Sequence, residues 1–289
     1  MIKFFTDSDT DISLQVAKEI GIELISMPYI INNEIIYPYK DFEVFDSKQF
    51  YDTLRSGNLP TTCALSPEEY AQYFEPVFAN GDDIVYIHFS SAMTATFDYM
   101  KETVEMLLKK YPERKFYSID TKAITIGSYY LVRSIMDKYK QGLSIEELLE
   151  FAKEEINHCA TYFFADDLKF FQKSGRVSGL SATMGNILGI KPIITINDEG
   201  VMKNISKEKG RKKALNKLVD YVLELGDEVY NHRIIIGHSD CIELAYMLGD
   251  LLKEKITTEL NIEYVVVNPT AGSHCGPNTI GVAFYGKHR

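Results

Sequence analysis

The stretch IVYIHFSSAMTATFD, residues 84–98, decides the fold that we predict for this chain. Its first part, Ile84 to Phe89, is an almost continuous apolar run, which is typical of a strand buried on both faces. A helical pattern follows, and residues 90–96 between them carry four hydroxyl groups and no charge. In open α/β sheets, ligands bind beyond the carboxyl ends of the strands, where helix N-termini favour anions. The stretch therefore predicts an α/β sheet with a site for one small anion.

The hydroxyl groups near this strand end have a second interpretation, which stays open. Ser90 or Ser91 serves in that case only as the N-cap of the following helix. A comparable segment lies upstream, where Thr61, Thr62 and Ser66 precede Pro67 at another predicted helix start. The sequence thus places hydroxyls beside two helix N-termini.

The order of predicted elements divides the chain into two domains, as its length of 289 residues allows. Strands and helices alternate through residues 1–160, which predicts an α/β domain with a parallel sheet. A capping box at Ser144 and Glu147 starts its last helix. Residues 161–289 mix hairpins with helix–strand units, which predicts an α+β domain with a mixed sheet, and they include a small-residue helix expected at Ser181–Gly189.

Composition and charge narrow the class of protein. The chain has 41 acidic and 31 basic side chains, which disfavours nucleic acid or an anionic membrane surface as its main partner. Its four cysteines are widely spaced, so neither a zinc site nor a disulfide framework is indicated, and a reducing compartment fits. No apolar run approaches the roughly 20 residues of a membrane span. We therefore expect a soluble cytoplasmic protein without a transmembrane segment.

Sequence motifs for several common chemistries are absent. The chain contains no G-x-G-x-x-G after a strand, no G-x-x-x-x-G-K-[ST], no G-x-S-x-G and no H-E-x-x-H. Nucleotide binding and metal-dependent hydrolysis are therefore disfavoured. The remaining candidates are polar segments at strand or helix ends: Asp7–Ser8, Thr61–Thr62, Ser90–Ser91, Gly175–Arg176 and His274.

Two of these candidates lie beside glycines in predicted loops. Arg176 follows Gly175, and from there its guanidinium can reach a partner or an anionic ligand. The alternative is a solvated surface arginine. His274 lies in the predicted loop 269–278, which permits close approach of backbone, although most lone loop histidines are incidental.

Taken together, these segments resemble those of the DegV family of bacterial fatty-acid-binding proteins, over nearly the whole chain. In chain order the similar segments are TDSDTDI (6–12, like T-D-S-x-x-D-L), TTCALSP (61–67, like T-T-S-Q-P-S-P), SSAMTAT (90–96, like S-S-x-L-S-G-T), KSGRVS (173–178, like K-G-G-R-I-S), IKPI (190–193) and HCGP (274–277, like H-T-G-P). The chain departs from the family pattern at Cys63, Ala64, Leu65, Thr94, Ala95, Ser174 and Cys275.

The resemblance implies that one long-chain fatty acid lies between a parallel α/β domain and an α+β domain. It further implies that Thr62, together with Ser91 or Ser90, holds the carboxylate, with Thr61 and His274 close by. Some members of the family carry the acyl group for a two-component fatty acid kinase, whose separate ATP-binding subunit phosphorylates the carboxylate for phospholipid synthesis. Arg176 resembles the position implicated in working with that kinase. We expect no metal, no cofactor and no catalytic residue of the chain's own.

Two rival functions stay open on the sequence alone. An acyl hydrolase would use Ser91 as nucleophile, His274 as base and Asp7 to orient the base, although Ser91 lacks the surrounding nucleophile elbow. An interaction module with a vestigial pocket is the other alternative, and it would bind no lipid.

Overall fold

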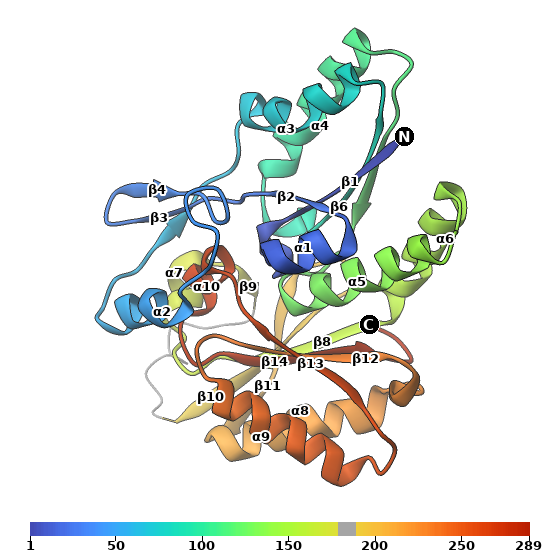
Figure 1. Ribbon diagram of the computed structural model, residues 1–289. Helices are drawn as coiled ribbons and strands as arrows, with labels where there is room; N and C mark the ends of the chain where they lie inside the picture. Colours follow the sequence, from blue (N-terminus) through green and yellow to red (C-terminus); the bar gives the residue numbers. More distant parts are fainter. Residues whose placement is uncertain (179–188) are drawn as a thin grey trace.

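The protein consists of two sheets with helices around and between them, together with a small third sheet (Figure 1). These features come from a computed structural model, which describes residues 1–178 and 189–289. The helix expected at Ser181–Gly189 lies almost entirely outside the described residues.

The first sheet is parallel throughout, as expected. Its strands run in the order β2 (Glu23–Ile25), β1 (Ile2–Asp7), β6 (Asp83–His88) and β7 (Phe116–Asp120). Five α-helices belong to this half: α1 (Leu14–Ile20), α3 (Pro67–Ala79), α4 (Thr96–Lys110), α5 (Ile126–Lys140) and α6 (Ile145–His158). The apolar run after Asp82 is the buried strand β6, and its carboxyl end leads into the short 3₁₀ turn η2 (Ser91–Met93) before α4 starts.

The second sheet has seven strands and is mixed. Its order is β13 (Asn261–Val266), β12 (Arg233–His238), β14 (Ile280–Tyr285), β8 (Cys159–Phe164), β10 (Ile190–Ile196), β11 (Met202–Lys209) and β9 (Val177–Ser178). Helices α8 (Arg211–Leu225) and α9 (Ile242–Lys255) cover one face (Figure 1). Ile234 and Ile236 of β12 pack with these helices, whereas Ile235 packs on the opposite face with α5. Successive side chains of a strand point to opposite faces of the sheet, and both faces of β12 are buried. This explains why the strand is an unbroken apolar run.

A small antiparallel sheet carries Thr62. Its strands are β4 (Glu34–Ile36), β3 (Tyr29–Ile31) and β5 (Thr61–Thr62). Asn32 and Asn33 form the turn between β3 and β4, with φ angles of 52° and 65°, as an Asn-Asn pair between two β-rich segments predicts. The β-rich segment before this turn is divided, since Glu23–Ile25 pairs with the parallel sheet and only Tyr29–Ile31 enters the hairpin. Helices α2 (Ser47–Arg55) and α7 (Lys169–Ser174) and the 3₁₀ turns η1 (Ser8–Thr10) and η4 (Val229–Asn231) complete the described elements.

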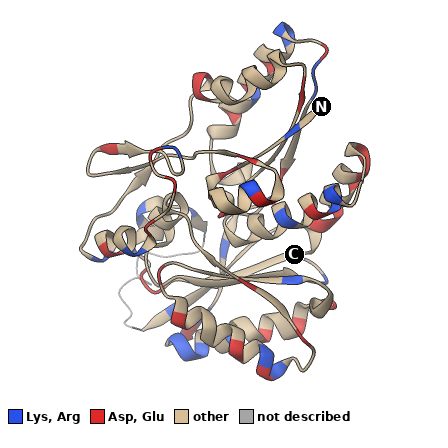
Figure 2. Ribbon diagram, in the orientation of Figure 1, with Lys and Arg blue, Asp and Glu red and all other residues tan. Residues whose placement is uncertain are grey.

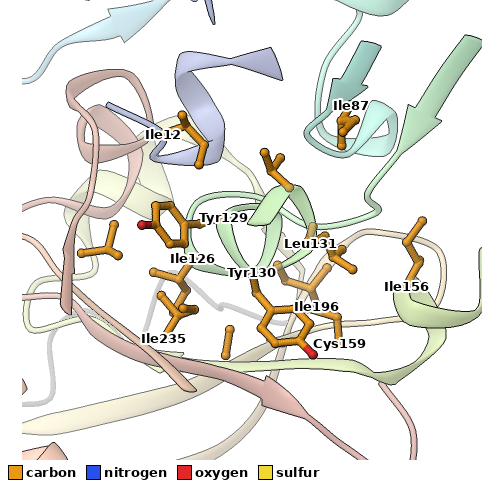
Figure 3. Packing of buried hydrophobic residues seen from close by; sticks show 14 of the residues in the cluster. Ile12, Ile87, Ile126, Tyr129, Tyr130, Leu131, Ile156, Cys159, Ile196 and Ile235 are labelled. Atoms are coloured by element: carbon orange, nitrogen blue, oxygen red, sulfur yellow. The ribbon is translucent and has the colours of Figure 1, made fainter. Parts of the chain in front are cut away.

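Helix α5 forms the centre of the core, between the two large sheets (Figure 1). Figure 3 shows its Ile126, Tyr129 and Leu131 between residues of the two halves, Ile12 and Ile87 on one side and Ile235 on the other. Both halves therefore share one hydrophobic cluster. Charged residues lie mainly on the outer helices, where both signs are interspersed (Figure 2).

The predicted loop at residues 269–278 is wrong, because most of it is helix α10 (Pro269–Cys275). The Asn268 side chain caps this helix by accepting the N–H of Ala271 at 2.9 Å, and Pro269 occupies its first turn. Gly272 and Gly276 suggested a loop. Gly272 is instead needed for packing, since a Cβ there would lie 2.5 Å from the Tyr51 hydroxyl.

The structure contains no candidate for a membrane-spanning helix within the described ranges, since none of the helices there is both long and apolar enough.

Candidate functional site

A cavity lies between the two large sheets and encloses about 960 Å³ of empty space, part of it open to solvent. Both halves of the chain contribute to the wall, which is largely apolar. The main apolar lining residues are Met27, Phe89, Met93, Ile124, Ile126, Phe163, Phe171, Ile196, Met202, Val267, Ala271 and Cys275.

The polar part of the wall includes Thr62 and His274, which are joined by a hydrogen bond. Thr62 Oγ1 lies 3.0 Å from His274 Nε2, so strand β5 and helix α10 meet at this point. Two predicted site residues, 212 positions apart in the chain, are thus brought together on the wall of one cavity. The side chains of both are only partly buried, which leaves them accessible from the cavity.

The electrostatic environment keeps His274 neutral. Burial and, to a smaller extent, the nearby Arg176 guanidinium together lower the pKa of its imidazole to about 4. Arg176 also lies on the cavity wall, and its Nη1 donates to the carbonyl of Ser174 at 2.5 Å. At neutral pH this end of the cavity therefore presents a hydroxyl, a neutral imidazole and one cationic side chain.

Helix α10 is held in place by buried contacts from the first half of the chain. Asp11 Oδ1 accepts hydrogen bonds from the backbone N–H and the side-chain amide of Asn268, at 2.8 and 2.7 Å. Thr270 Oγ1 donates to the carbonyl of Met27 at 2.7 Å. These contacts fix the orientation of the helix that carries His274. Asp11, in the acidic segment near the start of the sequence, thus helps to hold the helix that carries His274.

The structure does not place the serines after β6 on the cavity wall. Ser90 is fully buried, and its hydroxyl donates to the carbonyl of Gly200 at 2.8 Å. It also accepts the N–H of Ala92 at 3.3 Å and so caps the 3₁₀ turn η2, whereas helix α4, which the capping interpretation assigned to it, begins after Ala95 without a side-chain cap. Ser91 donates to Asp120 Oδ2 at 2.5 Å. Thr61, the remaining predicted hydroxyl, is exposed and likewise does not line the cavity as described.

Threonines that the sequence analysis did not single out line the cavity instead. Thr94 and Thr96 come from the same segment as the two serines and do reach the wall. An irregular turn has no fixed side-chain period, so the sequence alone does not show which residues of this segment line the cavity. Other hydroxyls on the wall are those of Thr125, Thr161, Thr270 and Thr279.

The hydrolytic triad is not assembled. His274 is hydrogen-bonded to Thr62, and Ser91 is hydrogen-bonded to Asp120. No described hydrogen bond joins Ser91 to His274. Asp7 is fully buried at the end of strand β1, where its Oδ2 accepts hydrogen bonds from the Tyr86 hydroxyl at 3.1 Å and from the Phe89 N–H at 3.2 Å. The geometry therefore gives no support to nucleophilic catalysis by Ser91.

Neither metal binding nor thiol chemistry is favoured by the arrangement. The described ranges contain no group of three or more His, Cys, Asp or Glu side chains placed to hold a metal ion. Cys63 and Cys275 line the cavity, and burial raises the pKa of the Cys275 thiol to about 12. The largely apolar wall of the cavity is suited to hold a largely apolar ligand.

The whole chain is similar to proteins of one family. Residues 1–287 match a family model described as an uncharacterised protein of the DegV family. A DegV domain-containing protein of Clostridium perfringens is 34% identical over 286 residues, covering 98% of this chain and 96% of the relative. Another from Clostridium acetobutylicum is 27% identical over 284 residues, covering 98% and 97%.

Solved structures share the same fold. A stearic acid-binding protein of Eubacterium ventriosum matches with a TM-score of 0.87 and 19% identity, over 99% of each chain. A DegV family protein of Ruminococcus gnavus with vaccenic acid matches with a TM-score of 0.85 and 20% identity, over 98% of this chain and 99% of that one. DegV of Bacillus subtilis, a fatty acid binding protein, matches with 0.81 and 22% identity, over 99% of each chain. At these identities the likeness shows a common fold.

Proposed function

The chain belongs to the DegV family, and from this premise we propose that it binds one long-chain fatty acid in the cavity between its two large sheets. The observation that carries the proposal is the distribution of apolar and polar residues on the wall of this cavity. Its wall is largely apolar with hydroxyl-bearing residues among the lining, and Thr62, His274 and the one basic side chain of the wall, Arg176, lie near one another on it. A molecule with one long apolar part and one small anionic end fits this distribution. The fatty acids bound by the proteins of similar fold support the same ligand class.

The apolar tail supplies most of the binding free energy in this proposal. Burying about 14 methylene groups at ~0.8 kcal/mol each gives roughly 11 kcal/mol before ordering costs. A hydrogen bond to a charged carboxylate contributes roughly 1.5–3 kcal/mol. The head-group contacts therefore decide the orientation of the ligand more than its affinity.

We assign the carboxylate to the end of the cavity where Thr62 meets His274. The Thr62 hydroxyl can donate to a carboxylate oxygen while accepting a hydrogen bond from His274, in the neutral tautomer that carries its hydrogen on Nε2. Ser91 would first have to give up its hydrogen bond to Asp120, and Ser90 the one to Gly200. Of the hydroxyls predicted from sequence, Thr62 is thus the best supported, and Thr61, Ser90 and Ser91 have supporting roles at most.

We further propose that the protein presents this fatty acid to a separate ATP-dependent fatty acid kinase subunit. In that reaction a carboxylate oxygen attacks the γ-phosphorus of ATP, the bond to the β-phosphate oxygen breaks, and acyl phosphate and ADP form. Thr62 and the neutral His274 leave the carboxylate nucleophilic, and the exposed Arg176 is placed to contact the kinase or the transferring phosphate. The acyl phosphate then enters phospholipid synthesis. Four free cysteines suit such a role in a reducing cytoplasm.

Ligand competition tests the binding proposal. Stearate should displace a fluorescent fatty acid from the purified protein, whereas octadecanol, which lacks the carboxylate, should displace it at least about tenfold less well. Equal displacement by both would show that the polar end does not recognise the acid. Failure of both would favour an interaction module without a lipid ligand.

Phosphoryl transfer tests the presentation proposal. With a fatty acid kinase subunit and ATP, T62A combined with S91A should lower acyl phosphate formation more than fatty acid retention. R176A should lower transfer by a larger factor than it lowers fatty acid affinity. Unchanged transfer in these variants would count against presentation to a kinase.

A further inference from the structure

The face of the mixed sheet that points toward α5 lacks side chains where it borders the cavity. On β12 this face carries Ile235 and then Gly237, because side chains of a strand alternate between its two faces. On the neighbouring β14 it carries Ala283 and Gly281, which are the register partners of those two residues. Gly237 and Gly281 both line the cavity. Two adjacent strands thus have no side chain at the same point, and we call this place the glycine hollow.

Ile126, the first residue of α5, fills the glycine hollow. A Cβ built on Gly237 would lie 2.2 Å from Ile126 Cγ2, and a Cβ on Gly281 would lie 3.1 Å from Ile126 Cδ1. Real Cβ atoms essentially never approach another heavy atom to 2.2 Å, so Ile126 and a side chain at position 237 exclude each other. Figure 3 shows Ile126 directed from α5 toward Ile235 of the sheet. The two glycines are therefore needed to admit this one isoleucine.

Ile126 also limits the space that a ligand has at this point of the cavity. Its side chain is only 3% exposed, and it lines the cavity together with both glycines. Isoleucine is branched at Cβ and stiff at χ1, and its two branches lie against the strands of the glycine hollow. Protein interiors are packed so closely that a change of one methylene group is felt. The side chain therefore has no free space into which it could retreat from a wider ligand.

We propose that Ile126 is a specificity-determining residue, which restricts the cavity to unbranched acyl chains. This inference rests on the proposed function and narrows the substrate class of that same site. A straight polymethylene chain has the same narrow cross-section at every carbon, whereas a methyl branch beside Ile126 needs volume that its side chain occupies. One methyl or methylene group in an apolar pocket is worth roughly 10–200-fold in discrimination.

The glycine hollow is formed by elements other than those that hold the head group in the proposed function. Ile126, Gly237 and Gly281 lie on α5, β12 and β14, whereas Thr62 lies on β5 and His274 on α10. Substitutions in the hollow should therefore change the choice of acyl chain and leave the recognition of the carboxylate intact.

Truncation of Ile126 and refilling of the glycine hollow are tested as a pair. I126A removes Cγ2 and Cδ1, and G237A then returns one methyl group to the hollow. This methyl group fits in the truncated protein, because the nearest remaining neighbour that it would meet is the Cβ of residue 126 at 3.5 Å, an ordinary van der Waals distance. I196A is the matched control, because Ile196 is a buried isoleucine of the same cavity wall, on β10, which β8 separates from β14.

A positional series of branched acids measures the selectivity. Stearate and its 6-, 10- and 14-methyl derivatives are each titrated against a bound fluorescent fatty acid. The wild type should bind stearate more tightly than each branched acid. I126A should raise the affinity for at least one branched acid, relative to stearate, by about tenfold or more. I126A/G237A should return that ratio to within about threefold of the wild-type value, and I196A should stay within the same range for that acid.

Thermal unfolding without ligand checks the packing separately. G237A should lower the Tm of the wild type, where its methyl group would clash with Ile126 Cγ2, and should not lower the Tm of I126A. An equal loss of Tm in both backgrounds would contradict the assignment of the hollow to Ile126.

Equal selectivity of I126A and the wild type would overturn the inference and leave fatty acid binding intact. A gain for branched acids that G237A does not reverse, or an equal gain in I196A, would overturn it as well. If I126A does not fold, I126V decides, because it removes only Cδ1: a smaller gain for the branched acid supports the inference, and no gain overturns it. Failure of the wild type to bind stearate or any branched acid would instead contradict the proposed function.

Discussion

The hydroxyl of Thr62 lies 3.0 Å from Nε2 of His274, and this contact joins the small antiparallel sheet to helix α10. Neither residue is close to the other in sequence, and each comes from a different half of the chain. The pair forms a polar end to an otherwise largely apolar cavity. Burial keeps the imidazole neutral, so in the function that we propose the carboxylate forms no ion pair with the histidine.

Removal of the Thr62 hydroxyl should weaken fatty acid binding. T62V keeps the side-chain shape and loses one hydrogen bond to a charged group, worth roughly 1.5–3 kcal/mol, or about tenfold to one hundredfold in affinity. Titration with stearate measures the loss. T61V is the matched control, because the exposed Thr61 does not line the cavity as described, and it should bind like the wild type. An equal loss in both variants would point to a disturbed strand β5 rather than a lost contact.

Substitution of Ser90 should affect stability and leave ligand affinity almost unchanged. Its hydroxyl donates to the carbonyl of Gly200, so the side chain ties the end of β6 to the mixed-sheet half. S90A should lower the free energy of unfolding by about 1 kcal/mol, the usual value of one hydrogen bond. Urea denaturation and stearate titration measure the two effects. A large loss of affinity with unchanged stability would return Ser90 to the carboxylate site.

The buried carboxyl of Asp7 should make stability depend on pH around neutrality. Burial raises its pKa to about 7, while hydrogen bonds from the Phe89 N–H, the Tyr86 hydroxyl and neighbouring backbone lower it. An unfolded aspartate titrates near pH 4, so the native state binds the extra proton between about pH 4 and 7. The stability that this proton supplies is lost as the pH rises through about 7.

D7N removes this titration. Between pH 6 and 8.5 the unfolding free energy of the wild type should fall relative to that of D7N by roughly 1 kcal/mol. The exposed Asp98 provides the control, since D98N should show no such change against the wild type. A constant difference between D7N and the wild type across this range would mean that Asp7 does not titrate near pH 7 in the folded protein.

The close approach of Gly272 to Tyr51 should make α10 sensitive to one methyl group. A Cβ at this position would lie 2.5 Å from the Tyr51 hydroxyl, which itself donates to the carbonyl of Val267 at 2.9 Å. G272A should therefore destabilise the protein by roughly 1–3 kcal/mol, as overpacking usually does. The penalty should shrink in a Y51F background, where the clashing oxygen is gone. Thermal unfolding of the four proteins decides this, and equal penalties in both backgrounds would refute the packing argument.

The sequence was informative where local rules and burial agree. Strand β6 was recognised as a doubly buried strand, and the capping box at Ser144 placed the start of α6 correctly, because its side-chain and backbone partners are three residues apart. The parallel first sheet and the mixed second sheet followed from the order of strands and helices. The domain boundary at residue 160 stays a prediction.

The sequence was uninformative where long-range packing decides. Gly272 and Gly276 suggested a loop, although the first is small because Tyr51 packs against it. Ser90 and Ser91 suggested ligand contacts, yet Gly200 and Asp120, far away in the chain, bind their hydroxyls. Asp9 and Thr161 gave no separate signal, because their position on the cavity wall depends on the approach of two sheets to α5. In the sequence, Asp9 is only one of three aspartates within residues 7–11.

The most direct test of the central claim is native mass spectrometry of the purified protein, combined with lipid extraction and analysis. The account predicts one fatty acid per chain, released on denaturation and replaced one-for-one by added stearate in the wild type. Protein that carries no lipid and shows no mass increase with excess stearate would contradict the claim that the cavity between the two sheets holds a fatty acid.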